Sequence, residues 1–205
     1  MSRPDSDPDH RRGPIRWTWR PHLRGEPAER LARDWLAPWT GIAGDERPLP
    51  RNAHGRPVIA SRDGRHDASW SHSGDILLIA VGEDVDVGVD VELLKPRKRA
   101  LELARRYFTA DETAWLAAQA APARDEAFVR LWCAKEAVLK AHGRGLAFGL
   151  HRLAFVEREG ALTLAATAPQ LGAPEAWTVH EFAPLPGYRA ALAWRPRRLG
   201  DTGDA

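Results

Sequence analysis

Val87-Gly-Val-Asp-Val-Glu92 has the alternation of a half-buried β-strand. The pattern puts Val85, Val87, Val89 and Val91 on one face and Asp86, Gly88, Asp90 and Glu92 on the other. A second stretch, Arg130-Leu-Trp-Cys-Ala-Lys-Glu-Ala-Val-Leu-Lys-Ala-His-Gly143, has the period of a helix that ends at a glycine. We predict that the chain is organised around this strand and this helix, with the acidic face of the strand toward the helix.

The predicted helix carries charged residues where an apolar surface is expected. Its apolar stripe contains Phe128, Leu131, Trp132, Leu139 and His142. Lys135 falls inside this stripe, so its ammonium must either reach solvent or be drawn to a charge. Glu136 and Lys140 lie one turn apart on the flank of the stripe.

Two carboxylates at the spacing of Asp90 and Glu92 repel each other unless they are solvated or bridged by a cation. With a third carboxylate from Glu136, their hard oxygens would suit Mg²⁺. Lysines beside such a site imply a substrate that carries phosphate. The alternative is that Asp90 and Glu92 end an edge strand in solvent and that Glu136 and Lys140 form an ordinary ion pair along a helix. Spacing alone leaves both open.

Several motifs, taken in order, carry a family resemblance. Asp90-Val-Glu92, Phe108-Thr-Ala-Asp-Glu112 and Trp132-Cys-Ala-Lys-Glu-Ala-Val-Leu-Lys140 resemble the signature of the Sfp-type 4'-phosphopantetheinyl transferases. Gly55-Arg-Pro57 and Ser71-His72-Ser73 resemble two further blocks, and the match runs from about Arg51 to Gly145. The resemblance implies an α+β fold of two pseudo-twofold-related lobes, each an antiparallel sheet packed on a long helix.

The resemblance also implies an activity. Such an enzyme, of the holo-[acyl-carrier-protein] synthase type, transfers 4'-phosphopantetheine from coenzyme A to a serine hydroxyl of an apo acyl or peptidyl carrier protein and releases 3',5'-ADP. By resemblance, Asp90, Glu92 and Glu136 hold Mg²⁺. Glu136, or a water that it orients, accepts the serine proton, and Lys140 stabilises the developing charge.

The same resemblance implies a set of residues that bind coenzyme A. They are Arg51, Gly55, Arg56, Pro57, Ser71, His72, Asp90, Lys135, Glu136 and Lys140. Two departures affect the detailed fit of the pocket: the family block usually has lysine where Arg56 stands, and often Phe-Asn-Leu where this chain has Ala68-Ser69-Trp70. A basic residue of the N-terminal helix, Arg30 or Arg33, is a further candidate for a phosphate contact, and no motif decides between them.

The order of elements predicts the domain organisation. We expect a disordered segment at 1–14, an N-terminal lobe at 15–95, a C-terminal lobe at 96–196 and a disordered tail at 197–205. Thr109 and Glu112 have the spacing of a capping box that begins a helix, so Glu112 is expected to be structural. Strands are predicted over 153–156, 161–165, 177–182 and 188–194.

Composition limits the other functional classes. The 205 residues are 43% hydrophobic, which is enough for a core, and 30 basic against 28 acidic residues give a net charge of only +2. Dispersed arginines and tryptophans in apolar patterns argue against a nucleic-acid-binding module. The one cysteine, Cys133, rules out an internal disulfide and is expected to be a small buried residue. No apolar run is long enough to span a bilayer. We therefore expect a cytoplasmic protein with no membrane or nucleic-acid partner, and a monomer, because one chain carries both halves of the site.

Two further readings remain open. A catalytically inactive relative that binds coenzyme A or a carrier protein is the alternative to an enzyme, although such a relative would be expected to have lost an acidic ligand. The basic run Lys95 to Arg99 fits a solvated linker. By resemblance, this run and the Ala100 to Tyr107 helix are candidates for docking an acidic carrier protein.

Overall fold

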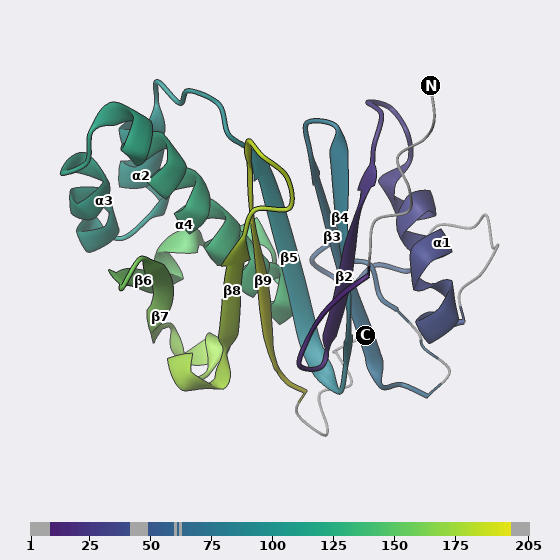
Figure 1. The fold of residues 1–205 in the computed structure, drawn as a ribbon. Helices are drawn as coiled ribbons and strands as arrows, with labels where there is room; N and C mark the ends of the chain where they lie inside the picture. The colour runs from purple at the N-terminus through teal and green to yellow at the C-terminus, as the bar shows by residue number, and fades with distance from the viewer. Residues whose placement is uncertain (1–8, 42–48, 60, 62, 198–205) are drawn as a thin grey trace.

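The chain folds into two α+β lobes that lie side by side (Figure 1). The computed structural model describes residues 9–41, 49–59, 61 and 63–197. The N-terminal lobe is an antiparallel sheet in the order β1-β2-β4-β3, with helix α1 beside it. Its elements are β1 (His10–Arg12), β2 (Ile15–Pro21), α1 (Ala28–Thr40), β3 (His66–Ser73) and β4 (Ile76–Glu83).

The C-terminal lobe is an antiparallel sheet in the order β5-β9-β8, packed on the long helix α4. Its main elements are β5 (Val85–Leu93), α2 (Ala100–Tyr107), α3 (Ala110–Ala117), α4 (Ala121–His142), β8 (Thr178–Phe182) and β9 (Tyr188–Pro196). A separate hairpin of β6 (Leu153–Arg158) and β7 (Ala161–Thr167) and four short 3-10 turns, Leu146–Phe148, Leu150–Arg152, Pro169–Leu171 and Pro174–Ala176, connect α4 to β8. The predicted α+β class, with a sheet on a helix in each lobe, is confirmed.

Strand β5 forms the seam between the lobes. It pairs with β9 from end to end, so its hydrogen bonds place it in the C-terminal sheet, whereas the sequence placed it in the N-terminal lobe. Its other edge faces β3, whose side chains accept the hydrogen bonds that a neighbouring strand would normally take. The amides of Val87, Val89 and Leu93 donate to Asp67 Oδ2 (2.8 Å), Ser69 Oγ (3.2 Å) and Ser73 Oγ (3.1 Å) respectively.

The alternation of β5 produces the two surfaces that the sequence predicted. Val85, Val87, Val89 and Val91 are all buried and pack in one cluster with Ile15, Trp17 and Leu78 of the N-terminal sheet. This cluster also includes residues of β9, so it forms an apolar core between the two sheets. The opposite, acidic face of β5 is turned toward α4.

Gly88 allows α4 to approach β5 closely. A Cβ atom added at Gly88 would lie 2.0 Å from the carbonyl oxygen of Ala137 and 2.4 Å from the amide nitrogen of Ala141. Any side chain here would therefore collide with the helix backbone. Because residue 88 has no side chain, the helix packs closely on the strand. Glu136 and Lys140, the neighbours of Ala137 and Ala141, therefore lie next to the acidic end of β5.

Some predictions about the ends of the chain are wrong or lie outside the described residues. Residues 1–8 and 198–205 lie outside them, but His10–Arg12, expected to be disordered, form β1 and pair with β2.

The capping box at Thr109 and Glu112 is confirmed. Over the part of the chain that the structure describes, no helix is both long and apolar enough to cross a membrane.

Replacing Gly88 by alanine tests the close contact between β5 and α4. Because the colliding atoms belong to backbone, we expect Gly88→Ala to lower the free energy of unfolding by about 3 kcal/mol, measured by chemical denaturation. Gly25→Ala is the matched control: an added Cβ there meets no atom within 4 Å, and only its φ of +93° is strained, so a loss of about 1 kcal/mol is expected. A Gly88→Ala protein as stable as the parent would show that the two elements are not held so closely.

Candidate active site

The contact between α4 and β5 brings Lys140 onto Asp90. The Lys140 ammonium donates to Asp90 Oδ1 at 2.7 Å, to Ser71 Oγ at 2.9 Å and to the Val89 carbonyl at 3.1 Å. Ser71 in turn donates to Asp90 Oδ1 at 2.7 Å. Three elements, β3, β5 and α4, therefore meet at one carboxylate oxygen.

Glu136 lies one helical turn before Lys140 and is buried, with 6% of its surface exposed. Burial, and then the neighbouring carboxylates of Asp90 and Glu92, raise the pKa of Glu136 to about 7, while Lys140 acts in the opposite direction. Asp90 is also buried, and its Oδ2 atom has no hydrogen-bond partner. The alternative in which Asp90 ends an edge strand in solvent is thus wrong, and Lys140, which that alternative paired with Glu136, is ion-paired with Asp90.

Glu92 extends the acidic group toward the outside. It accepts hydrogen bonds from Ser73 Oγ at 3.2 Å and from Arg97 Nη2 at 3.0 Å. The Arg97 guanidinium also lies over the ring of Phe128 on α4. Arg97 belongs to the basic run after β5, so part of that run is folded onto the site.

The acidic residues fit a divalent cation in their chemistry but do not form a finished cage. Within the described ranges, no three acidic, histidine or cysteine side chains converge tightly enough to hold a metal ion by themselves. Mg²⁺ is commonly held by one or two carboxylates together with water and substrate phosphate. The unpartnered oxygen of Asp90, buried near Glu136, fits a cation ligand. The set Asp90, Glu92 and Glu136 stays a prediction.

A cavity of about 330 Å³ opens beside Lys140 and Glu136. It lies between the lobes, because loop 51–57 and β3 line one side and the end of α4 lines the other. The predicted residues that line it are Arg51, Gly55, Arg56, Pro57, Glu136 and Lys140. Ala68, Ser69 and Trp70, which the sequence marked as a departure affecting the fit of the pocket, also line it. Sequence reasoning missed the lining residues His54, Gly143 and Gly145.

Loop 51–57 is a tight turn held to both lobes. Arg51 donates to the carbonyl of Gly55, whose φ is +81°, and also pairs with Glu29 of α1. The Arg56 guanidinium donates to Asp67 Oδ2 at 2.7 Å and to the carbonyl of Val87 on β5 at 2.8 Å. Arg56 is therefore partly occupied by structural contacts while it lines the cavity.

Ser71 and His72 stand at the edge of the site and do not line the cavity. Ser71 bonds to Asp90 and Lys140, whereas His72 is exposed and packs against His22 in a tilted arrangement, with ring centres 4.8 Å apart. Burial, His22 and Lys140 lower the pKa of His72. His22 follows β2 and carried no signal in the sequence. Of the two arginines left open on α1, Arg33 is buried and ion-paired with Glu29, and neither Arg30 nor Arg33 lines the cavity.

Comparison with known proteins gives the family. Residues 86–193 match the sequence profile of the 4'-phosphopantetheinyl transferase superfamily. The chain is 30% identical over 174 residues to the 4'-phosphopantetheinyl transferase HetI of Nostoc sp., which covers 82% of this chain and 70% of that relative. The chain belongs to the 4'-phosphopantetheinyl transferase superfamily.

Two further relatives match over shorter regions. The 4'-phosphopantetheinyl transferase psf-1 of Bacillus pumilus is 36% identical over 143 residues, which are 69% of this chain and 58% of the relative. A relative from Synechocystis is 35% identical over 102 residues, 48% of this chain and 41% of its own length. The chain thus spans only about half the length of these two superfamily members.

Lys135 is the one predicted coenzyme A ligand that the structure contradicts. It is completely buried, pairs with Glu112 of α3 at 2.8 Å, and donates to the carbonyls of Leu150 and Leu153. An ammonium has three donors, and all are engaged inside the C-terminal lobe. Lys135 therefore holds α4, α3 and the start of β6 together, and it cannot reach a phosphate in the cavity. Glu112 is structural, as predicted.

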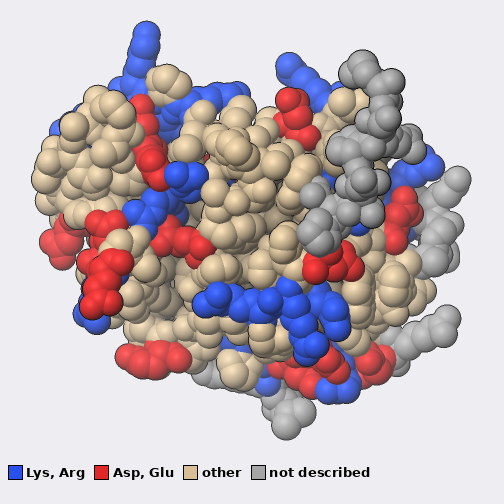
Figure 2. Space-filling model, viewed as in Figure 1, with Lys and Arg blue, Asp and Glu red and all other residues tan. Residues whose placement is uncertain are grey.

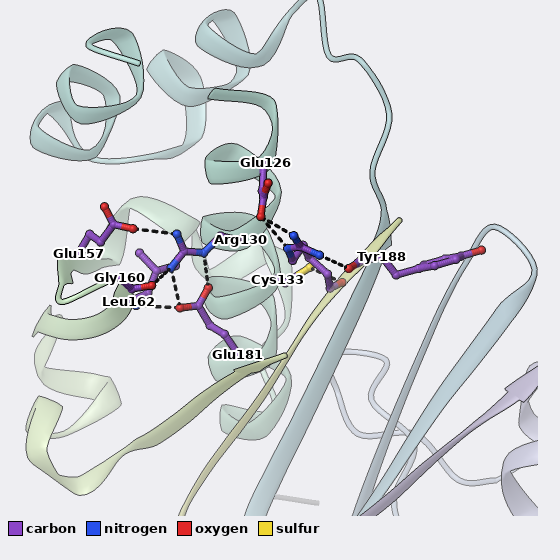
Figure 3. A network of polar contacts seen from close by, with 9 residues as sticks. Glu126, Arg130, Cys133, Glu157, Gly160, Leu162, Glu181 and Tyr188 are labelled. Atoms are coloured by element: carbon purple, nitrogen blue, oxygen red, sulfur yellow. Dashed lines mark hydrogen bonds and ion pairs between the residues drawn. The ribbon is translucent and has the colours of Figure 1, made fainter. Parts of the chain in front are cut away.

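A second polar network joins α4 to strand β8 and to the separate β6–β7 hairpin (Figure 3). Arg130 bridges Glu157 of β6 and Glu181 of β8, at 2.8 Å each, and Glu181 also accepts from the amide of Leu162 on β7. Cys133 is buried beside the carbonyl of Arg189, and burial raises its pKa well above the usual value. The cysteine is a packed residue, as expected from the sequence.

A larger cavity, of about 510 Å³, is lined by residues of β7 and β8 and of the segment between them. Its charged lining residues are Arg158 and Glu175, and the rest are apolar or threonine. None of the family motifs reaches it. The cavity beside Lys140 is therefore the candidate active site.

Removing the Lys135 ammonium should damage stability. Lys135→Met leaves the buried Glu112 carboxylate without its positively charged partner, and such a change typically costs about 3 to 5 kcal/mol. We expect this loss in denaturant unfolding, with coenzyme A affinity unchanged in the protein that remains folded. In a double-mutant cycle with Glu112→Gln, the double variant should lose less stability than the sum of the losses of the two single variants. If the variant bound coenzyme A more weakly without losing stability, Lys135 would be a coenzyme A ligand after all.

The pKa of Glu136 predicts a pH dependence of stability. Because its pKa rises from 4.5 in a model peptide to about 7, the folded protein binds the proton more tightly than the unfolded chain. The contribution of this group to stability is therefore present at low pH and lost as pH rises through about 7. In chelator, between about pH 5 and pH 8, the parent should lose stability relative to Glu136→Gln. Parallel profiles of stability against pH for the two proteins would contradict a buried Glu136 carboxyl with a raised pKa.

Proposed function

We propose that the protein transfers 4'-phosphopantetheine from coenzyme A to a serine hydroxyl of an apo carrier protein, with Mg²⁺, and releases 3',5'-ADP. The observation that carries this proposal is the meeting of Lys140, Glu136 and Asp90 at one end of a cavity lined by arginines. Family membership supports the type of reaction. The carrier, the donor and the metal are what the family resemblance implies, and the chemistry of the site is compatible with them.

The cavity suits the nucleotide end of coenzyme A. Arg51, His54 and Lys140 supply hydrogen-bond donors for phosphate oxygens, and the backbone at Gly55 and Gly143 has no side chain to obstruct a ligand. Trp70 adds an apolar wall. A ligand whose phosphates lie near Lys140 would leave its pantetheine arm pointing out along β5 toward Glu92.

The transfer itself needs a base and a site for developing negative charge. The serine oxygen forms a bond to the phosphorus that carries the pantetheine, and the bond from that phosphorus to the leaving 3',5'-ADP oxygen breaks. Glu136, or a water that it orients, accepts the serine proton. Lys140 lies where it can stabilise charge on the phosphate oxygens. Asp90, Glu92 and Glu136 would hold Mg²⁺, and that ion would supply positive charge to offset the charge of the pyrophosphate.

A basic surface next to the site would match an acidic carrier protein. Lys95, Lys98, Arg105 and Arg106 are exposed on the segment after β5 and on α2, and Arg97 of the same segment reaches Glu92. In Figure 2, basic side chains project from this region at the top of the view, with acidic ones beside them. A carrier bound here would present its serine close to Glu92 and Glu136.

The competing proposal is an inactive relative that binds coenzyme A or a carrier. The two proposals differ in whether the acidic residues carry chemistry. In this chain Asp90, Glu92 and Glu136 are all present, and two of them are buried together. That arrangement favours the enzyme, because buried carboxylates without a role in catalysis or structure are costly.

Mass spectrometry of carrier proteins tests the proposal. The parent, incubated with coenzyme A, Mg²⁺ and a panel of apo carriers, should add one phosphopantetheine group to at least one of them. Asp90→Asn should lower the rate by at least about a hundredfold, because it removes a charge that contacts Lys140. Asp86→Asn is the matched control, since Asp86 lies on the same face of β5 and pairs with Arg195 away from the cavity. Carriers that gain no mass, or an Asp90→Asn variant as active as Asp86→Asn, would refute it.

A further inference from the structure

Asn52 joins the two lobes at the candidate active site. It lies in loop 51–57 of the N-terminal lobe, and its side-chain Nδ2 donates to the carbonyl of Gly143 at 3.0 Å. Gly143 is the residue that ends α4 and has a left-handed φ of +87°. The bond thus ties the loop to the end of the helix that carries Glu136 and Lys140.

The other end of the same side chain shapes the loop. Asn52 Oδ1 accepts from the amides of His54 at 2.9 Å and Arg56 at 3.0 Å, and the backbone of Asn52 bonds to Arg56 and Gly55. One carboxamide therefore supplies an acceptor to the loop and a donor to the helix. Aspartate would keep the acceptor and lose the donor, because an ionised carboxylate has no N–H group.

The residues on both sides of this bond line the cavity. His54, Gly55 and Arg56 stand on the loop side, and Gly143 and Gly145 on the helix side. An added Cβ at Gly143 would lie 3.4 Å from Asn52 Nδ2, so the two segments are in van der Waals contact. The contact between Asn52 and Gly143 consequently fixes the distance between loop 51–57 and the end of α4 at this point of the cavity.

We infer that Asn52 is a positioning residue that holds the nucleotide-binding loop in register with α4. This inference rests on the proposed function. The bonds of Lys140 to Asp90, Ser71 and Val89 do not involve Asn52. Losing the Asn52 bond should therefore weaken binding of the nucleotide and leave the chemical step almost unchanged.

Two substitutions remove the bond between the lobes, one with and one without the contacts inside the loop. Asn52→Asp keeps both acceptor contacts within the loop and removes the bond to Gly143, whereas Asn52→Ala removes all three. We expect both variants to raise KM for coenzyme A and to weaken the affinity for 3',5'-ADP by about tenfold, with kcat within about threefold of the parent. KM does not depend on the fraction of enzyme that is folded, so simple loss of stability cannot imitate this result.

Asp63→Ala is the matched control. Asp63 accepts from the amide of Arg65 at 3.0 Å in a similar turn on the N-terminal lobe and does not line the cavity, so KM should not change. An Asn52→Asp enzyme with the KM of the parent, or a fall in kcat at constant KM, would overturn the inference. If the parent bound neither coenzyme A nor 3',5'-ADP in calorimetry, the proposed function would fail first and the inference with it.

Discussion

The close approach of α4 to β5 at Gly88 is the constraint on which the site depends. A side chain at that position would meet the helix backbone at 2.0 Å, so the helix can reach the strand only because none is there. The contact buries Asp90 and Glu136 beside each other and lets Lys140 bond to both β5 and β3. Lys140 offsets part of the repulsion between the buried carboxylates, and one Asp90 oxygen remains without a hydrogen-bond partner. A strand, a helix and a missing side chain thus create a site that favours an additional positive charge.

The second constraint is the free edge of β5. An unpaired strand edge normally needs a neighbouring strand, a covering element or solvent. Here alternate polar side chains of β3 take that place, since Asp67, Ser69 and Ser73 accept from β5 amides. Ser71, in the same row, instead bonds to Asp90 and Lys140. One row of short polar side chains therefore both joins the lobes and supplies a residue to the candidate active site.

Much of this arrangement could be predicted because it depends on local periodicity and on motifs in order. Alternation gave the two faces of β5, and the helical period placed Glu136 and Lys140 together. Alternation does not say which strand pairs with β5, and so its pairing with β9 was not predicted. Lys135 shows the same limit: its place in an apolar stripe was correct, but its partner, Glu112, comes from another helix whose packing no local pattern describes. Asn52 was missed because its role depends on a contact 91 residues away.

Hydrogen exchange with coenzyme A tests most directly the claim that the cavity between the lobes is the active site. With saturating coenzyme A and Mg²⁺, we expect slower exchange at the amides of loop 51–57 and of residues 143–145, which line that cavity. The amides of residues 162–165 and 177–179, around the larger cavity between β7 and β8, should be unaffected. Protection confined to β7 and β8, with loop 51–57 unchanged, would contradict the account.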